Sequence, residues 1–474
     1  MSELLSNPSS FVMKGVIIHT PNFGELELIR NGAIFYDNNG VIKRVVDISA
    51  DPSCLNDLTP TVSVMDYSGK MILPGLIDAH CHAPQYVFAG TGNDLPLLDW
   101  LQKYTFPTEA RFSDPVFAKM AYSRAVKRHL HYGTTCASYF ATIHLEASKI
   151  LYDVINRLGQ RAYVGKVSMD RNSPDYYVET TNTAILEAEE FVKYCLRQSD
   201  RGRFILRNID NNIPNNEISL LNHENTPLIL PVITPRFVPT CTTKLMIALG
   251  DIAQKYSLLP IQSHLNECKP EVTWVAELHP EASCYTQVYE QNGLCNSQAY
   301  MAHCVHCNLL DVNILQSTQT GIVHCPASNF NIGSGVCDVR AHLDRGLKVG
   351  LGTDVAAGVS CSMLDAIRQT VICSRAISFQ KEDQGIPYSV LSYKEAFYLA
   401  TMGSADVLSM SSQLGSISEG KKLDCLVVDL EEADSPIDVF DSDDQLDCFQ
   451  KFLFLGDDRN IVKVYVNGKL VVSK

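Results

Sequence analysis

The sequence predicts an α/β protein in which a (β/α)8 TIM-type barrel is joined to a small β-sandwich domain formed by both chain ends. Three observations lead to this prediction. The chain has 474 residues, enough for one large barrel and an accessory domain. Strand-like runs fill both ends, and the long middle alternates apolar runs with helix-length segments. We expect the barrel at 74–412 and the two parts of the small domain at 1–73 and 413–474.

The two ends of the chain resemble each other in pattern. Each contains short β-rich runs, and the N-terminal part also carries an Asp-Asn-Asn-Gly segment at 37–40. Such segments have the turn chemistry of hairpins. The runs are Gly15–Ile18 and Val41–Val46 near one end, and Leu426–Leu430 and Val462–Lys469 near the other. Two strand-rich ends around a long middle predict one small β domain assembled from both.

The middle of the chain contains eight apolar runs separated by segments of helix length, as a (β/α)8 barrel requires. We expect strands at Gly75–Asp78, Thr134–Phe140, Arg161–Lys166, Leu228–Thr234, Leu259–His264, Ala299–His303, Gly321–His324 and Lys348–Asp354. A doubly wound open sheet is the alternative, but no glycine-rich phosphate fingerprint follows the early strands. The segment Gln198–Thr226 is polar and rich in Asn and Asp, and we expect a surface insertion there.

The composition restricts the classes of function. Hydrophobic residues make up 46% of the chain and charged residues 19%, which is ordinary for a globular protein with a substantial core. Asp and Glu total 53 against 39 Lys and Arg, a formal net charge of -14, and no Lys/Arg-rich run is present. Because such a chain repels a phosphate backbone, we expect no nucleic-acid partner. No apolar stretch reaches the roughly 20 residues that span a bilayer, so we expect no membrane partner.

The cysteines and the N-terminus bear on the compartment. Sixteen cysteines are spread over a long chain, unlike the dense disulfide framework of a short secreted protein. The segment Met1–Gly15 lacks the charged start and long apolar run of a signal peptide. We therefore expect free thiols and a cytoplasmic location.

Potential metal ligands end several of the expected strands. His80 and His82 follow the first, and residues two apart in an extended segment share a face, so both can reach one ion. His264 ends the fifth strand, His303 the sixth and Asp354 the eighth. Singly, each has an ordinary explanation, such as a hydrogen-bonded core histidine or a capping aspartate. Barrel active sites lie at the carboxyl ends of the strands, so the joint pattern predicts a zinc site with an open position for water.

Two other patterns could indicate a metal site of a different kind. His144–Glu146 matches the first half of the H-x-E and P-C-x-x-C signature of cytidine-deaminase-type enzymes, but no P-C-x-x-C follows. His303–Cys307 is similar to a zinc knuckle, but no second ligand pair lies at suitable spacing. We expect Cys304, His306 and Cys307 to be packing or surface residues. His324 ends the seventh strand, and the sequence allows two placements for its side chain: at the barrel mouth or in the core.

Longer segments resemble the amidohydrolase superfamily. Those around the expected ligands are Pro74–His82, His264 itself and Gly352–Asp354. Further segments are similar to the members of this superfamily that deaminate guanine, namely Ala83–Gly90, Asp94–Leu101, Lys103–Pro107, Thr234–Phe237, Gln262–Glu267, His324–Asn329 and Lys451–Asn460. The likeness covers most of the chain, and Gln198–Thr226 is the main departure.

The resemblance implies a zinc-dependent aminohydrolase. It implies one zinc ion per subunit, usually in a homodimer, and the hydrolysis of guanine by water to xanthine and ammonia in purine catabolism or salvage. The implied metal ligands are His80, His82, His264 and Asp354. The implied catalytic residues are Asp354, which takes a proton from water, Glu267, which passes protons to the substrate, and His303, which orients the water.

The resemblance also implies contacts with the purine. The expected substrate-binding residues are His82, Ala83, Pro84, Gln85, Leu97, Trp100, Arg236, Phe237, His264 and Asp354. Among them, Gln85 and Arg236 are expected to hydrogen-bond the edge of the base, with Arg236 suited to the O6 carbonyl. Phe237 offers the flat ring an apolar contact. For Leu97 and Trp100, packing in the core is the alternative.

Two further functions stay open on the sequence alone. One is a related deaminase or hydrolase that acts on another aminated ring, such as an s-triazine or a pterin, and the discriminating residues would be Gln85, Arg236 and Phe237. The other is a non-catalytic scaffold built on a degenerate fold, which predicts missing ligands, whereas all four are present. No candidate carboxylated lysine ends the fourth strand at Thr234–Arg236, which favours one metal ion over two.

Overall fold

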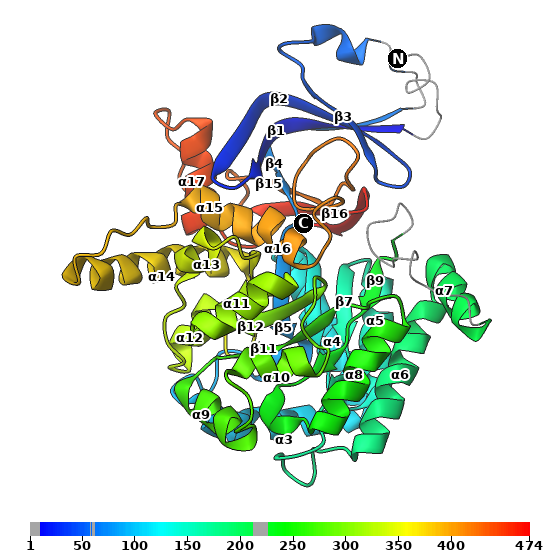
Figure 1. The fold of residues 1–474 in the computed structure, drawn as a ribbon. Helices are drawn as coiled ribbons and strands as arrows, with labels where there is room; N and C mark the ends of the chain where they lie inside the picture. The colour runs from blue at the N-terminus through cyan, green and yellow to red at the C-terminus, as the bar shows by residue number, and fades with distance from the viewer. Residues whose placement is uncertain (1–9, 57, 59–61, 212–225) are drawn as a thin grey trace.

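The computed structural model describes residues 10–56, 58, 62–211 and 226–474. In Figure 1 the strands from both chain ends lie together above the middle of the chain, whose strands are surrounded by helices. The predicted mixed α/β content is confirmed. Among the described residues, no helix has both the length and the apolar character needed to cross a membrane.

Strands from both ends pair into one seven-stranded sheet, in the order β17-β16-β15-β4-β1-β2-β3. These strands are β1 Ser10–Asn22, β2 Glu25–Asp37, β3 Ile42–Asp47, β4 Ser63–Pro74, β15 Cys425–Val428, β16 Ile461–Val466 and β17 Lys469–Ser473. The two ends meet where β4 pairs in parallel with β1 and antiparallel with β15. The described strands thus form one sheet, and the predicted sandwich of two layers is not confirmed. The boundaries at 73/74 and 412/413 stay a prediction.

The middle of the chain forms two parallel four-stranded sheets, β5-β6-β7-β9 and β11-β12-β13-β14. Their bounds match the eight predicted runs closely: β5 Leu76–His82, β6 Thr134–Phe140, β7 Arg161–Gly165, β9 Ile229–Pro231, β11 Ile261–Leu265, β12 Ala299–His303, β13 Gly321–His324 and β14 Val349–Leu351. Two short strands, β8 Val167–Ser168 and β10 Thr234–Pro235, pair with each other. Nearly every residue of the eight strands is buried, as expected where both faces of a parallel sheet are covered.

Backbone hydrogen bonds join the two sheets at both pairs of edges. At one, Ile233 N donates to Pro260 O and Gln262 N donates to Ile233 O, each over 2.9 Å. At the other, Asp354 N donates to His80 O over 2.9 Å. A Cβ on Gly352 would lie 2.9 Å from the carbonyl oxygen of His80, so this close approach requires glycine.

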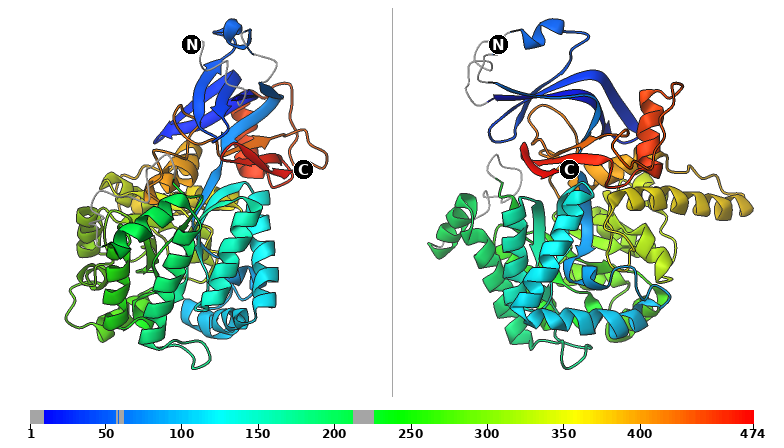
Figure 2. Two further views of the ribbon diagram at one scale, coloured as in Figure 1. Left: turned by 90° about the vertical axis from the view of Figure 1, so that its right-hand side faces the viewer. Right: turned by 180° about the vertical axis from the view of Figure 1, so that it is seen from behind.

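Helices cover the two sheets, and several begin at a capping side chain. The carboxylate of Asp114 accepts from Val116 N at the start of α4, and the Asn308 side chain caps α11. The helices are α2 Leu97–Trp100, α3 Phe106–Ala110, α4 Pro115–His131, α5 Leu145–Leu158, α6 Thr181–Arg197, α7 Asp200–Asp210, α8 Thr243–Lys255, α9 Lys269–Leu278, α10 Tyr285–Gln291, α11 Leu309–Thr318, α12 Pro326–Asn331, α13 Val339–Asp344, α14 Met363–Asp383, α15 Tyr393–Tyr398, α16 Ser404–Val407 and α17 Gln445–Leu455. Figure 2 shows α14 extending away from the body of the molecule.

Part of the predicted insertion at Gln198–Thr226 is helical, since α7 occupies Asp200–Asp210. Residues 212–225 of that segment lie outside the described part of the chain. All sixteen cysteines are free thiols in the structure.

A buried ion pair ties the seven-stranded sheet to the strands below it. Arg161, at the start of β7, donates from Nε and Nη2 to the carboxylate of Asp424, over 2.9 and 3.2 Å. Its Nη2 also donates to Asn467 Oδ1 over 2.8 Å, in the turn between β16 and β17. Because the guanidinium and the carboxylate are paired at two points, their burial is compensated.

Candidate active site

The predicted metal ligands meet at the carboxyl ends of the parallel strands. His80 and His82 lie at the end of β5, His264 in β11 and His303 at the end of β12. Asp354 follows β14 by three residues. Because the strands are parallel, their carboxyl ends open on the same side, and these five side chains converge there although 274 positions separate His80 from Asp354.

Local backbone structure holds the last of these residues in place. The buried carboxylate of Asp78 accepts from Thr353 N over 3.0 Å and from Thr353 Oγ1 over 2.5 Å, which ties the turn after β14 to β5. Asp354 and His303 both have positive φ angles, 46° and 74°. A left-handed conformation of this kind is uncommon outside glycine and costs on the order of 1 kcal/mol, so the surrounding contacts must hold it.

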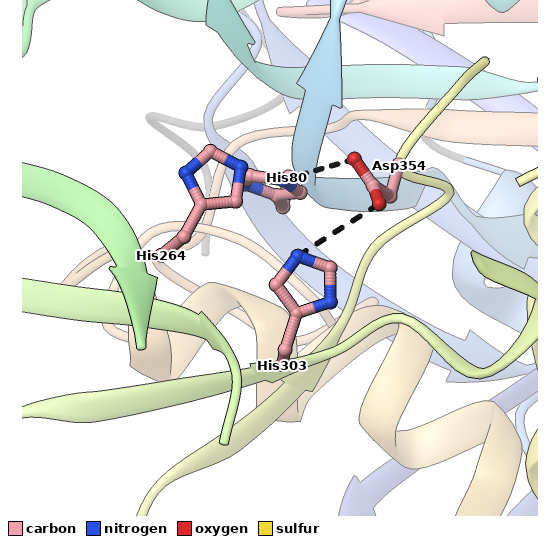
Figure 3. Close-up of side chains that lie close together, drawn as sticks. All are labelled: His80, His264, His303 and Asp354. Carbon is pink, nitrogen blue, oxygen red and sulfur yellow. Dashed lines mark hydrogen bonds and ion pairs between the residues drawn. The ribbon is translucent and has the colours of Figure 1, made fainter. Parts of the chain in front are cut away.

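The ligand atoms approach one another closely. Asp354 Oδ1 lies 3.1 Å from His80 Nε2 and 3.4 Å from His82 Nε2, and the Nε2 atoms of His82 and His264 are 3.1 Å apart. In the group shown in Figure 3, the ligand atoms of His80, His264, His303 and Asp354 all lie within 4.8 Å of one another. The structure therefore gathers all four predicted ligands and adds His303 at the same point.

The chemistry of these atoms fits a cation. His264 donates Nδ1–H to the carbonyl oxygen of Arg236 over 2.7 Å, so its Nε2 carries a lone pair. Burial and neighbouring imidazoles lower the pKa of His264 well below its ordinary value, and burial also lowers the pKa of His82. Two neutral imidazoles whose Nε2 atoms face each other beside a carboxylate are a donor set that could hold a metal ion.

Asp354 carries the negative charge of the cluster. Burial would raise the pKa of its carboxyl group, but the hydrogen bond from His80 and the surrounding imidazoles hold that pKa well below its ordinary value. The side chain is almost fully buried, with 4% of the residue exposed. An ionised carboxylate is therefore available to a cation and to a proton on water.

Glu267 and His303 form a second pair beside the cluster. His303 Nε2 lies 3.4 Å from Glu267 Oε2 and 3.8 Å from Asp354 Oδ2. Burial raises the pKa of Glu267 to about 7, although nearby His303 acts to lower it. Ser334 Oγ donates to Glu267 Oε1 over 2.9 Å, and Asn329 Oδ1 accepts from His303 Nδ1 over 2.9 Å. A carboxyl group with a pKa near neutrality can both give and take a proton.

Gln85 and Arg236 lie together on another wall, around a carboxylate that the sequence did not single out. Arg236 donates from Nη1 and Nη2 to Glu109, over 2.6 and 3.1 Å, and Gln85 Nε2 donates to the same carboxylate over 2.9 Å. Tyr177 adds a fourth hydrogen bond from its hydroxyl group over 2.7 Å. Burial would lower the pKa of the Arg236 guanidinium, but Glu109 keeps this pKa above its ordinary value.

Most of the residues described above line one pocket of about 400 Å³, the open space at its mouth included, and Glu109 and Tyr177 lie outside that lining. Its lining contains nearly all the predicted residues together with three that were not predicted, in the set His82, Gln85, Leu97, Trp100, Leu101, Arg236, Phe237, His264, Glu267, His303, Ile332, Asp354 and Ala357. Ala83 and Pro84 are buried in the short 3-10 helix after His82 and are outside this set. His80 lies behind the lining, in contact with Asp354.

The competing patterns do not gather further ligands in the described part of the chain. Neither His144 nor Cys307 belongs to a group of three or more candidate metal ligands there. His306 Nε2 instead faces the carbonyl oxygen of Ser334 over 2.7 Å, and Cys304 is fully buried. His324 is also fully buried and lies outside the pocket lining, which favours the core over the barrel mouth.

Comparison with known proteins decides the family. A family model described as the amidohydrolase family matches residues 71–471. Guanine deaminase of Dictyostelium discoideum is 41% identical over 470 residues, which cover 97% of this chain and 98% of that protein. Guanine deaminase of Homo sapiens is 38% identical over 473 residues, 98% of this chain and 97% of that protein. The chain belongs to the guanine deaminase family of amidohydrolases.

A solved guanine deaminase supports this membership at the level of the fold. The crystal structure of the guanine deaminase from C. acetobutylicum, which has guanine bound in its active site, superposes with a TM-score of 0.83 and 34% identity. The match covers 97% of this chain and 99% of that one. Because the likeness runs through almost the whole chain, the pocket at the carboxyl ends of the strands belongs to a fold that this family shares.

Proposed function

We propose that this protein hydrolyses guanine to xanthine and ammonia. The observation that carries the proposal is that one buried pocket combines a His/Asp cluster, a proton-carrying Glu267 and a wall formed by Gln85 and Arg236. Membership of the guanine deaminase family supports guanine as the substrate, because relatives of 38–41% identity over nearly the full chain carry that name.

The cofactor of this reaction is one zinc ion, held by His80, His82, His264 and Asp354. Three imidazoles and one carboxylate suit Zn²⁺ and leave a position for water. His303 also lies within 4.8 Å of the ligand atoms of His80, His264 and Asp354. We assign it to the attacking water and not to the metal because its Nε2 also faces Glu267 Oε2, at 3.4 Å. When bound, zinc lowers the pKa of water toward neutrality and so supplies a nucleophile at neutral pH.

The chain's own side chains move the protons. Asp354, kept ionised by its neighbours, takes a proton from the water that attacks C2 of the purine. Glu267 protonates a ring nitrogen, recovers a proton from the C2 hydroxyl group as the carbonyl forms, and delivers it to the amino group, which leaves as ammonia. The proton held by Asp354 then restores the acid form of Glu267. His303, oriented by Asn329, hydrogen-bonds the attacking water and stabilises charge at the tetrahedral carbon. Guanine and water are thereby consumed, and xanthine and ammonia are formed.

Recognition of the base uses the opposite wall. Arg236 donates to the O6 carbonyl, and Gln85 hydrogen-bonds the same edge of the ring. Phe237, Leu97 and Trp100 give the flat faces apolar contact, which their place in the pocket lining supports. Ala83 and Pro84 contribute by shaping the backbone between His82 and Gln85.

The decisive experiment measures ammonia released by the purified protein from guanine, adenine, cytosine, pterin and melamine. We expect release from guanine, with xanthine as the second product, and little from the others. Release from adenine but not from guanine would refute the proposal. Release from melamine or pterin alone would assign the protein to a related ring hydrolase.

Three finer features belong to the same proposal. The two parallel sheets form one closed (β/α)8 barrel at about 74–412, which the backbone hydrogen bonds at both pairs of edges support. The protein acts in the cytoplasm as a homodimer. Exposed apolar side chains on the protruding α14, Ile372 at 55% and Phe379 at 60%, support an interface, and light scattering of the purified protein tests it.

A further inference from the structure

The carboxylate of Glu109 lies behind the pocket wall formed by Gln85 and Arg236 and is hydrogen-bonded to both. Glu109 lies in α3, Phe106–Ala110, and none of its surface is exposed. Its two oxygens accept four hydrogen bonds, two from Arg236 and one each from Gln85 and Tyr177. Burying a carboxylate is costly unless charge and hydrogen bonds compensate it, and here both do so completely.

Glu109 determines which way the amide of Gln85 points. The Nε2 group of Gln85 donates to the carboxylate over 2.9 Å, and Oε1 accepts from Ala356 N over 3.3 Å. A carboxylate accepts only, and a backbone N–H donates only, so the reversed amide would lose both hydrogen bonds. One further N–H of this amide is thereby left in a fixed direction.

Helix α3 also holds the Arg236 guanidinium from two sides. Glu109 accepts from Nη1 and Nη2, and the centre of the Phe106 ring lies 5.2 Å from the guanidinium carbon. A guanidinium has five N–H donors in a rigid fork, so fixing two of them fixes the direction of the others. Pairing with Glu109 also offsets the positive charge, and the remaining donors then suit a neutral carbonyl better than an anion.

We propose that Glu109 is a positioning residue that sets the specificity of the pocket for a purine with a carbonyl oxygen at C6. It does so by holding Arg236 and Gln85 in a single orientation before the substrate binds. The inference rests on the proposed guanine deamination. It adds to it a residue that touches neither the substrate nor the metal ligands, and whose effect therefore appears in selectivity.

The test compares guanine with 2-aminopurine, which has the same ring and amino group but no oxygen at C6. In Glu109→Gln, one carboxylate oxygen becomes an NH₂ group facing the donors of Arg236, so the bidentate pair is lost. We expect the KM for guanine to rise roughly 30-fold or more, while the inhibition constant of 2-aminopurine changes less than about 3-fold. Zinc content should stay at the wild-type level.

A matched control carries the same chemical change at another buried ion pair. Glu179 lies 2.6 Å from the Lys166 ammonium, and neither residue lines the pocket. Glu179→Gln should leave the ratio of the two constants unchanged, even if it lowers stability. Tyr177→Phe, which removes one hydrogen bond but keeps the ion pair, should shift the ratio in the same direction by less than about 5-fold.

The outcomes distinguish a failure of the proposed deamination from a failure of the role of Glu109. If the wild-type protein releases no ammonia from guanine, the proposed function is refuted, whatever the variants show. An active wild type for which Glu109→Gln changes both constants equally, or neither, overturns only the role of Glu109. If Glu109→Gln does not fold, Glu109→Asp keeps the charge but shortens the side chain, and the same selective rise in the guanine KM is expected in a weaker form.

Discussion

The two halves of the pocket satisfy their polar atoms in opposite ways. In the metal half, formed by His80, His82, His264, His303 and Asp354, like atoms face one another, as the Nε2 atoms of His82 and His264 do at 3.1 Å. Among the described residues of this half, His303 Nε2 has no hydrogen-bond partner, although it faces the carboxylates of Glu267 and Asp354 at 3.4 and 3.8 Å. In the recognition half, formed by Gln85, Glu109 and Arg236, donors face acceptors throughout.

The two halves therefore differ in whether they need a bound ion or water to satisfy their polar atoms. Buried polar atoms without partners carry a free-energy cost, which a bound cation and water would offset in the metal half. The recognition half is already paired and is preorganised for a ligand. We therefore expect changes in the metal half to abolish turnover, and changes in the recognition half to weaken binding and selectivity.

The largest effect is expected from removing a ligand of the metal half. His264→Ala takes away one imidazole and leaves its partners facing a cavity, so bound zinc and deamination should disappear together. We expect kcat/KM for guanine to fall at least roughly a thousandfold, about 4 kcal/mol of transition-state stabilisation. Metal analysis of the purified variant and an ammonia assay measure the two losses.

A histidine outside the pocket provides the control for this variant. His131, partly exposed at the end of α4, can be changed to Ala with no expected loss of zinc.

The pair His82→Ala and His303→Ala then tests the composition of the ligand set. His82→Ala should lose zinc and His303→Ala should retain it, and the reverse result would move His303 into the ligand set.

A smaller effect, without loss of metal, is expected at the border of the metal half. Glu267→Gln keeps the shape and the Ser334 contact but cannot carry a proton. We expect zinc content to be unchanged and kcat to fall roughly a hundredfold to a thousandfold. A variant that turns over at a near-normal rate would exclude Glu267 as the proton carrier.

In the recognition half the expected change is chiefly in KM. Arg236→Lys retains a positive charge beside Glu109 but replaces the planar fork by a single ammonium, which cannot pair with the carboxylate at two points and also reach a carbonyl. We expect the KM for guanine to rise roughly 50-fold, or about 2 kcal/mol, with zinc retained. An unchanged KM would remove Arg236 from recognition and would erase the distinction between the two halves.

The convergence of the predicted ligands in space could be foreseen because they obey the geometry of parallel strands. His80, His82, His264 and Asp354 each follow an apolar run, and the carboxyl ends of such runs converge in an α/β fold. The strands of both ends were also foreseen, but not their arrangement. A pattern of strand residues specifies which face is buried and does not specify which strand pairs with which, so the sequence could not predict the order of the seven strands, and the predicted sandwich stays unconfirmed.

The residues that orient the site were missed for a different reason. Glu109 and Asn329 stand alone in short helices, α3 and α12, with no spacing that relates them to Arg236 or His303. Their importance comes from contacts across 127 and 26 positions of the chain. The one available signal for Glu109 is its position, because this acidic residue lies two positions after Lys103–Pro107, a segment that resembles the family.

The smallest effect is expected from a residue that only orients the metal half. Asn329 Oδ1 accepts from His303 Nδ1, which directs the other ring nitrogen toward Glu267 and Asp354. In Asn329→Ala the imidazole can rotate or change tautomer, so kcat should fall about tenfold while the guanine KM and the zinc content stay nearly constant. Asn331→Ala, two residues on in the same helix, removes only a contact with the Ala357 carbonyl and serves as the control. If Asn329→Ala raised KM and left kcat unchanged, His303 would belong with the recognition half, and the pocket would have to be divided differently.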